Sequence, residues 1–175
     1  GTLDVASGAT LTLGANETVS ALTSAGTING AFTLQAATYG LSGGQVDSNL
    51  GTGTLNQTAN TTTLNGTAGA TTVNISGGTL QLGGADKLAD TAALNISGGG
   101  TLNLGGNTDT VGAVTLTNGT ISNGTLTGSG YTVHQGTVSA NLAGTGNLTK
   151  QTAAQTVTLS GTNTYSGTTT VSAGT

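Results

Sequence analysis

Residues 100–121 read GTLNLGGNTDTVGAVTLTNGTI, and residues 9–28 read ATLTLGANETVSALTSAGTI. Both stretches contain Thr-Leu-x-Leu-Gly, then an asparagine, an acidic residue and Thr-Val, and both end on Gly-Thr-Ile. Their apolar residues stand two positions apart, which is the period of a β-strand with one buried face. A phrase of this length that recurs in one chain predicts a protein built from structural repeats.

The same alternation continues through most of the chain. No stretch keeps the 3.6-residue period of an amphipathic helix, and threonine, glycine and asparagine are poor helix formers. The alternation therefore predicts an all-β protein. The apolar pairs with one residue between them are Leu11/Leu13, Val73/Ile75, Leu80/Leu82, Leu94/Ile96, Leu102/Leu104, Val114/Leu116 and Val157/Leu159.

The composition indicates a thin core. Glycine occurs 32 times and threonine more often still, while charged residues make up 5% of the chain and aromatic residues 2%. Such a low charge with so much glycine and threonine also occurs in disordered chains, but the regular apolar alternation favours strands. Small layers that stack on one another need fewer large side chains than a sandwich or a barrel. The absence of proline also suits strands that are paired on both sides.

The chain reads as two diverged units of about 92 residues, about 1–93 and 94–175, within a single domain. Leu3-Asp4-Val5 matches Leu94-Asn95-Ile96, and Tyr39 matches Tyr131. Inside each unit, strand pairs recur about every 20 residues, separated by Asn-Gly and Gly-Gly pairs that are typical of tight corners.

This pattern predicts a right-handed single-stranded parallel β-helix, or β-solenoid, of about eight coils of roughly 20 residues. At about 4.8 Å for each coil, the rod would be about 40 Å long. The threonine and asparagine residues between the apolar positions should face solvent. We expect these side chains to face inward: Leu11, Leu13, Leu80, Leu82, Leu94, Ile96, Leu102, Leu104 and Val157.

The C-terminal stretch NLTKQTAAQTVTLSGTNTYSGTTTVSAGT, residues 147–175, has the most specific motif. It resembles the passenger-associated transport repeat of bacterial autotransporters, also called the autotransporter-associated β-strand repeat. The segment between Lys150 and Leu159 departs from that family, because Thr152, Ala153 and Ala154 replace its usual glycines. The matching residues are Leu148, Lys150, Leu159, Ser160, Gly161, Asn163, Thr164, Tyr165, Ser166, Gly167, Thr169, Val171 and Gly174.

The motif covers about a sixth of the chain, and a looser similarity to repetitive surface proteins covers nearly all of it. The resemblance implies a right-handed β-helix that is exported to the bacterial surface, commonly within a large adhesin.

Enzymes with parallel β-helices also exist, and the acidic residues are the candidates for catalysis in such an enzyme. Glycoside hydrolysis needs two carboxylates that face one cleft, and a cleft containing Asp47, Asp86 and Asp90 would favour an enzyme. Glu17 and Asp109 occupy matching places in the two units, so we interpret both as soluble coil corners. The chain has no arginine to hold an acidic sugar. The acids are Asp4, Glu17, Asp47, Asp86, Asp90 and Asp109, and the lysines are Lys87 and Lys150.

Other sites have little support in the sequence. His134 is the single histidine and there is no cysteine, which disfavours a metal site. The charge cluster Asp86–Asp90 is interpreted as a local ion pair on an exposed loop rather than a calcium or ligand site. Tyr39 and Tyr131 are interpreted as corner or stacking residues rather than a platform for sugars. Ice binding needs Thr-x-Thr on one face of every coil, and Asn103 replaces Thr12 in the second unit. We therefore predict no catalytic, cofactor or metal residue, and no enzyme.

The sequence also bears on partners. A net charge of -4 without a basic stripe disfavours nucleic acid, and no apolar run is long enough to span a membrane. Both ends of the chain lie inside the repeat, so partners would be further coils of a longer chain or other copies stacked end to end. The first hypothesis is a non-catalytic section of an autotransporter-type adhesin stalk at the bacterial outer surface, facing a host or neighbouring cell. The alternative is the subunit of a self-assembling extracellular filament.

Overall fold

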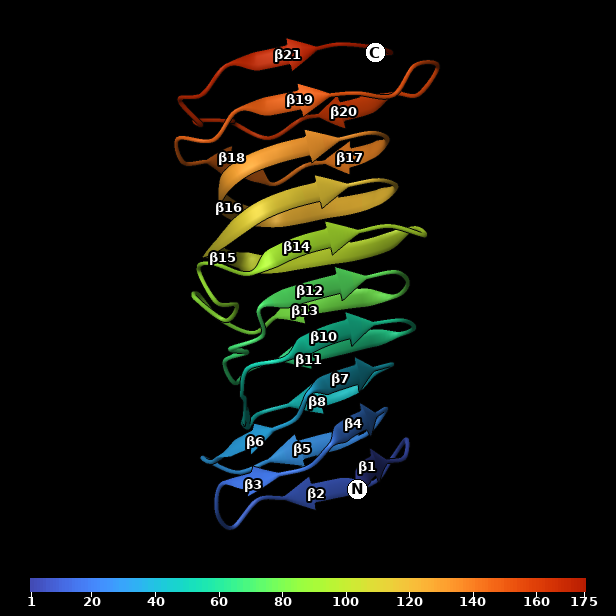
Figure 1. Cartoon of the computed structure of the whole chain (residues 1–175), viewed down its shortest axis with the longest axis vertical. Helices are drawn as coiled ribbons and strands as arrows, with labels where there is room; N and C mark the ends of the chain where they lie inside the picture. Colours follow the sequence, from blue (N-terminus) through green and yellow to red (C-terminus); the bar gives the residue numbers. More distant parts are fainter.

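The chain folds into a parallel β-solenoid with no helix, in a computed structural model that describes residues 1–175. It makes about nine turns of about 18 residues. The coils stack along one axis, with the N-terminus at one end of the rod and the C-terminus at the other (Figure 1). The all-β solenoid predicted from the sequence is confirmed.

Three faces run along the rod, and every pairing between coils is parallel. The first face begins each coil and continues from one end of the rod to the other. Its strands are β1 (Thr2–Val5), β4 (Ala21–Ser24), β7 (Thr38–Leu41), β10 (Thr54–Gln57), β12 (Thr72–Ile75), β14 (Ala93–Ile96), β19 (Leu148–Lys150) and β21 (Thr169–Val171).

The second face follows in each coil after a tight corner. Its ladder is also parallel from the first coil to the last. Its strands are β2 (Thr10–Thr12), β5 (Thr27–Asn29), β8 (Gly44–Val46), β11 (Thr61–Leu64), β13 (Thr79–Leu82), β17 (Gly136–Val138) and β20 (Val157–Leu159).

The third face closes the coil and is the least regular. Its short strands are β3 (Glu17–Thr18), β6 (Thr33–Gln35), β9 (Asn49–Leu50) and β18 (Asn141–Ala143), and single bridges link Leu50 to Ala68 and Ala68 to Leu88. Two long strands, β15 (Gly100–Leu116) and β16 (Gly119–Val133), run across all three faces and join them in the middle coils.

The interior follows the alternation of the sequence. In β12, Val73 and Ile75 are buried while Thr72 and Asn74 are partly exposed. The core contains 35 buried residues that are mostly leucine, isoleucine, valine and alanine. Of the predicted inward residues, all are buried except Leu11 and Val157, which are only partly buried because they lie in the end coils.

The coils are shorter and more numerous than the predicted eight of roughly 20 residues. The step along the first face is 16 residues from Tyr39 to Leu55 and 21 residues from Val73 to Leu94. Tight corners shorten most coils: Asn123 and Gly124, for example, turn with φ angles of 59° and 148° in the left-handed region that glycine and asparagine tolerate.

The register on the second face differs from the match between the two units. Leu11 follows a column through Ile28, Val46 and Leu64 to Leu82, whereas Leu102 is aligned with Leu80, two residues before Leu82. The drift is two residues, so the same side of the strand still faces inward. The match does hold on the first face, where Leu3 and Leu94 belong to one column.

Candidate functional site

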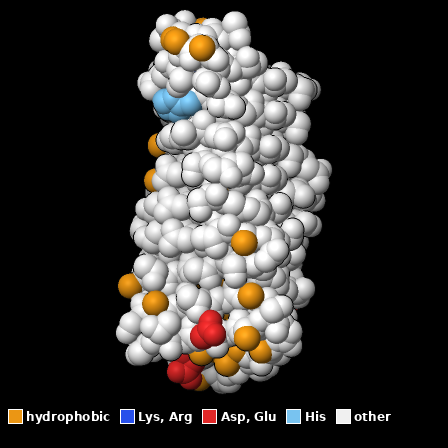
Figure 2. Space-filling model, turned by 90° about the vertical axis from the view of Figure 1, so that its right-hand side faces the viewer, with side chains coloured by type: hydrophobic (Ala, Val, Ile, Leu, Met, Phe, Trp, Pro, Cys, Tyr) orange, Lys and Arg blue, Asp and Glu red, His pale blue; other side chains and the backbone are white.

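The outer surface consists mainly of hydroxyl and amide side chains. Figure 2 shows one side of the rod, on which charged side chains are rare and hydrophobic atoms gather at the lower end and are scattered elsewhere. On the first face, the Asn74 Nδ2 donates to Asn56 Oδ1 at 2.9 Å, and Asn95 Nδ2 donates to Asn74 Oδ1 at 3.0 Å. Such an asparagine ladder strengthens the stacking of three successive coils.

A threonine column lies on the second face and extends through six coils. The adjacent outward column is mixed, since it contains Gln81 and Asn103. The paired threonine columns considered for ice binding are therefore not formed. The members of the single column are Thr61, Thr79, Thr101, Thr120, Thr137 and Thr158.

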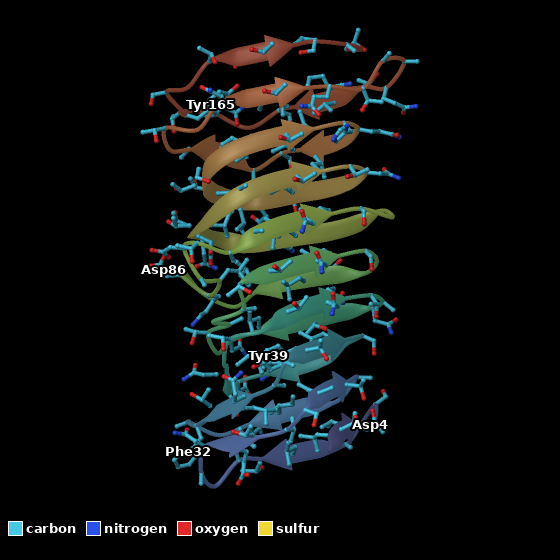
Figure 3. All side chains as sticks on the ribbon, in the orientation of Figure 1. Asp4, Phe32, Tyr39, Asp86 and Tyr165 are labelled. Atoms are coloured by element: carbon cyan, nitrogen blue, oxygen red, sulfur yellow. The ribbon has the colours of Figure 1, made fainter.

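Tyr39 fastens the corner between the third and first faces from inside the rod. Its hydroxyl accepts a hydrogen bond from the Ala36 amide at 2.9 Å and lies 3.1 Å from the Leu34 carbonyl and 3.2 Å from the Thr52 carbonyl. Burial raises the pKa of this hydroxyl above its ordinary value. The interpretation as a corner residue is confirmed, and Figure 3 shows Tyr39 within the coil.

Tyr131 repeats this arrangement in the second unit. The Gly128 amide donates to its hydroxyl at 2.7 Å, and the Leu126 and Ala143 carbonyls lie at 2.9 and 2.6 Å. Its ring also packs against Tyr165, with the ring centres 5.9 Å apart. Burial raises the pKa of the Tyr131 hydroxyl as well.

Two long polar side chains fasten the next corner in the same inward manner. Gln57 Nε2 donates to the Ala59 and Asn60 carbonyls at 2.6 and 3.2 Å. Lys150, which is 3% exposed, donates through Nζ to the Thr152 carbonyl and, at 3.2 Å, to the Ala173 carbonyl. The lysine of the C-terminal motif is therefore a buried corner residue.

Asp109 lies inside the rod, and its prediction as a soluble corner residue is wrong: its side chain is 0% exposed. It pairs with Leu126, which continues to Leu142, and so it occupies an inward column of the third face. Its Oδ2 atom accepts hydrogen bonds from the Lys87 and Leu88 amides at 2.7 and 3.3 Å, whereas its Oδ1 atom is buried without a partner.

The surroundings of Asp109 favour its protonated form. Burial raises the pKa of its carboxyl to about 6, and the charges of Asp86 and Asp90 add to this, while the two amide hydrogen bonds oppose it. Asp86 and Asp90 are themselves exposed, as predicted for their loop, but Leu88 between them is buried.

The remaining acids lie apart on the surface. Asp47 accepts hydrogen bonds from Gln45 at 2.8 and 2.9 Å and from Asn65 at 2.7 Å, and Asp4 accepts one from Thr23. Asp47 is thus on a different coil from Asp86 and Asp90, and these three carboxylates do not converge in one cleft. No group of three histidine, cysteine or acidic side chains could hold a metal ion.

Three hollows are present on the rod. A hollow of about 260 Å³ at the N-terminal end is lined by Leu3, Leu11, Leu13, Val19 and Leu34 with one acid, Glu17. A second, of about 360 Å³, is lined by glycine and hydroxyl residues of the third face and by Asp90. The third, of about 90 Å³ at the C-terminal end, has no acid. Each hollow therefore offers at most one carboxylate.

His134 lies beside the corner that Lys150 fastens, with its Nδ1 atom 2.6 Å from Thr152 Oγ1.

The structure contains no helix that is long and apolar enough to cross a membrane.

The comparisons with known proteins give no match. No protein-family model matches the chain, and no curated protein or solved structure is significantly similar to it.

Proposed function

We propose that the chain is a non-catalytic, extracellular section of a bacterial surface stalk of the autotransporter adhesin type. The observation that carries this proposal is the ladder of the first face, which continues in parallel register from β1 to β21. The resemblance of residues 147–175 to the passenger-associated repeat supports the family and the location. In such a stalk the rod holds a binding region away from the cell and toward a host or neighbouring surface.

The construction suits that role physically. The chain makes 105 backbone hydrogen bonds, and most of them join one coil to the next. Bending the rod would stretch many of these bonds at once. A protease needs an extended segment with free backbone groups, and paired strands offer few of them. Inward tyrosine, glutamine and lysine residues fasten the corners, where a solenoid would otherwise open first.

A second candidate function is a filament subunit that stacks end to end. It is favoured by the parallel ladders of the first and second faces, which the strands of another copy could extend in the same register. An end-to-end contact between unlike surfaces does not close on itself and therefore produces a filament.

Sedimentation velocity over a wide concentration range separates the two functions. The stalk predicts a monomer at every concentration, because its ends meet other coils only within one longer chain. Growth into longer species would favour the filament and contradict the stalk.

A matched pair of variants identifies the contact if growth occurs. Val171→Lys places a charge at the C-terminal end, whereas Thr170→Lys places the same charge on the outer surface of the same strand. A filament requires that only Val171→Lys stops growth. Growth that both variants retain would overturn the end-to-end contact.

A further inference from the structure

The loop at residues 83–91 is the one place where the rod carries three charges together. It joins β13 to β14 in one of the longest coils and contains Asp86, Lys87 and Asp90. Asp86 has a φ of 50° and is exposed, and Figure 3 shows it at the side of the rod. In solenoids, such insertions project from one face and commonly carry the contacts with partners.

The side chain of Asp109 joins this loop to β15 through the Lys87 and Leu88 amides, beside one backbone hydrogen bond from the Asp86 amide to the Thr108 carbonyl at 3.2 Å. At the equivalent positions of the coils below, the ladder is purely backbone: the Leu50 amide donates to the Thr67 carbonyl at 2.8 Å, and the Ala68 amide to the Lys87 carbonyl at 2.7 Å. At the next step, the Leu88 amide donates to Asp109 Oδ2 instead, and the Lys87 amide donates to the same oxygen. A carboxyl group thus replaces a ladder carbonyl where the loop joins the sheet.

The second oxygen of Asp109 makes this attachment sensitive to charge. Oδ1 is buried without a hydrogen-bond partner, and an ionised carboxylate in such a place loses much of its hydration. The loop amides lie directly against the carboxyl group, so movement of the loop is the simplest way to admit water to it.

No neighbouring cation compensates that charge. The loop contributes Asp86 and Asp90, which repel it, and Lys87, whose side chain lies against Gly84. The stretch of about two coils below, residues 48–82, and the facing strand β16 contain no charged residue.

We propose that Asp109 is a proton-dependent latch: the protonated side chain holds the loop at residues 83–91 against the rod, and loss of the proton loosens it. The latch is independent of the proposed stalk function, because it concerns one loop and not the ends of the rod. The pKa of about 6 places the change between mildly acidic and neutral conditions. Loosening the loop exposes Leu88, which is 3% exposed while the loop is held and lies between the already exposed Asp86 and Asp90.

Amide hydrogen exchange measured by NMR between pH 4.5 and 7.5 tests the latch. After correction for the intrinsic exchange rate, protection of the Lys87 and Leu88 amides should fall about tenfold or more as the pH rises through about 6. Protection of Val73 and Leu102, in the flanking strands, should stay constant. In Asp109→Asn the loop amides should show no such pH dependence.

Glu17→Gln is the matched control, because Glu17 occupies the corresponding place in the first unit but is exposed. It should behave as the unmodified chain does. A carboxyl ¹³C titration of the unmodified chain keeps the test independent of any folding defect in a variant. A titration midpoint of Asp109 near 4, loop protection that does not change with pH, or an equal change in Asp109→Asn would overturn the latch.

Discussion

Replacing Leu102 with aspartate will destabilise the solenoid by at least about 4 kcal/mol, because it places an unpaired charge in the dry centre of the middle coils. Leu102 is 0% exposed and is aligned with Leu80 in one neighbouring coil and with Ile121 in the other. No positively charged side chain lies close enough to compensate the charge of the introduced carboxylate. The loss should be visible as a large shift of the guanidinium unfolding midpoint followed by circular dichroism.

The neighbouring residue provides the control for this prediction. Thr101→Asp introduces the same side chain one position earlier in β15, where the side chain faces outward between Thr79 and Thr120. There we expect a loss of about 1 kcal/mol or less, owing to the lower strand propensity of aspartate. Equal losses for Leu102→Asp and Thr101→Asp would contradict the assignment of an inner and an outer side to this strand.

The stability of the unmodified chain should fall as the pH rises from about 4 to about 6. The pKa of Asp109 is raised from 3.8 to about 6 by burial, so between these values the folded chain keeps a proton that the unfolded chain has released. Ionisation of the folded state therefore costs stability, and the difference corresponds to about 3 kcal/mol. Above about pH 6, Asp109 is ionised in both the folded and the unfolded chain, so its contribution to the unfolding free energy stays constant.

Chemical unfolding at a series of pH values measures this dependence. Asp109→Asn keeps an oxygen that can accept the Lys87 and Leu88 amide hydrogen bonds but does not titrate, so its unfolding free energy should change less over the same range. The prediction is contradicted if the unfolding free energies of the unmodified chain and of Asp109→Asn rise by the same amount between pH 4 and 6. That result would show that Asp109 does not ionise in a buried position.

The fold could be predicted because its main features are local in the sequence. Alternation such as Thr72-Val73-Asn74-Ile75 sets the inner and outer sides, and pairs such as Asn123-Gly124 supply the corners. The length of each coil could not be predicted as well, because glycine-rich corners gain or lose residues freely. The register on the second face drifts by two residues for the same reason, and a drift of two does not disturb the alternation.

The buried polar residues were harder to identify, although the sequence contains a signal for them. Gln57, Asp109 and Lys150 each stand two positions from a buried apolar residue, so the strand period places all three inside. Their side-chain chemistry suggests the surface instead. Backbone groups at the corners and in the loop at residues 83–91 decide whether such a side chain is buried or exposed. These groups come together only in the folded coil.

Distances between pairs of nitroxide labels test the central claim, that the chain is a rigid rod in which each coil adds a fixed length. The chain has no cysteine of its own, so labels can be attached at introduced cysteines without interference. The outward column of the first face contains Thr23, Thr115, Thr132 and Thr149, with the last three residues five, six and seven coils from Thr23.

Pulsed electron double resonance should give narrow distributions centred near about 24, 29 and 34 Å for Thr23 paired with Thr115, Thr132 and Thr149, because each coil adds about 4.8 Å. Equal steps and narrow widths are the result that a rigid solenoid requires. Broad distributions, or distances that do not increase from Thr115 to Thr149, would contradict it.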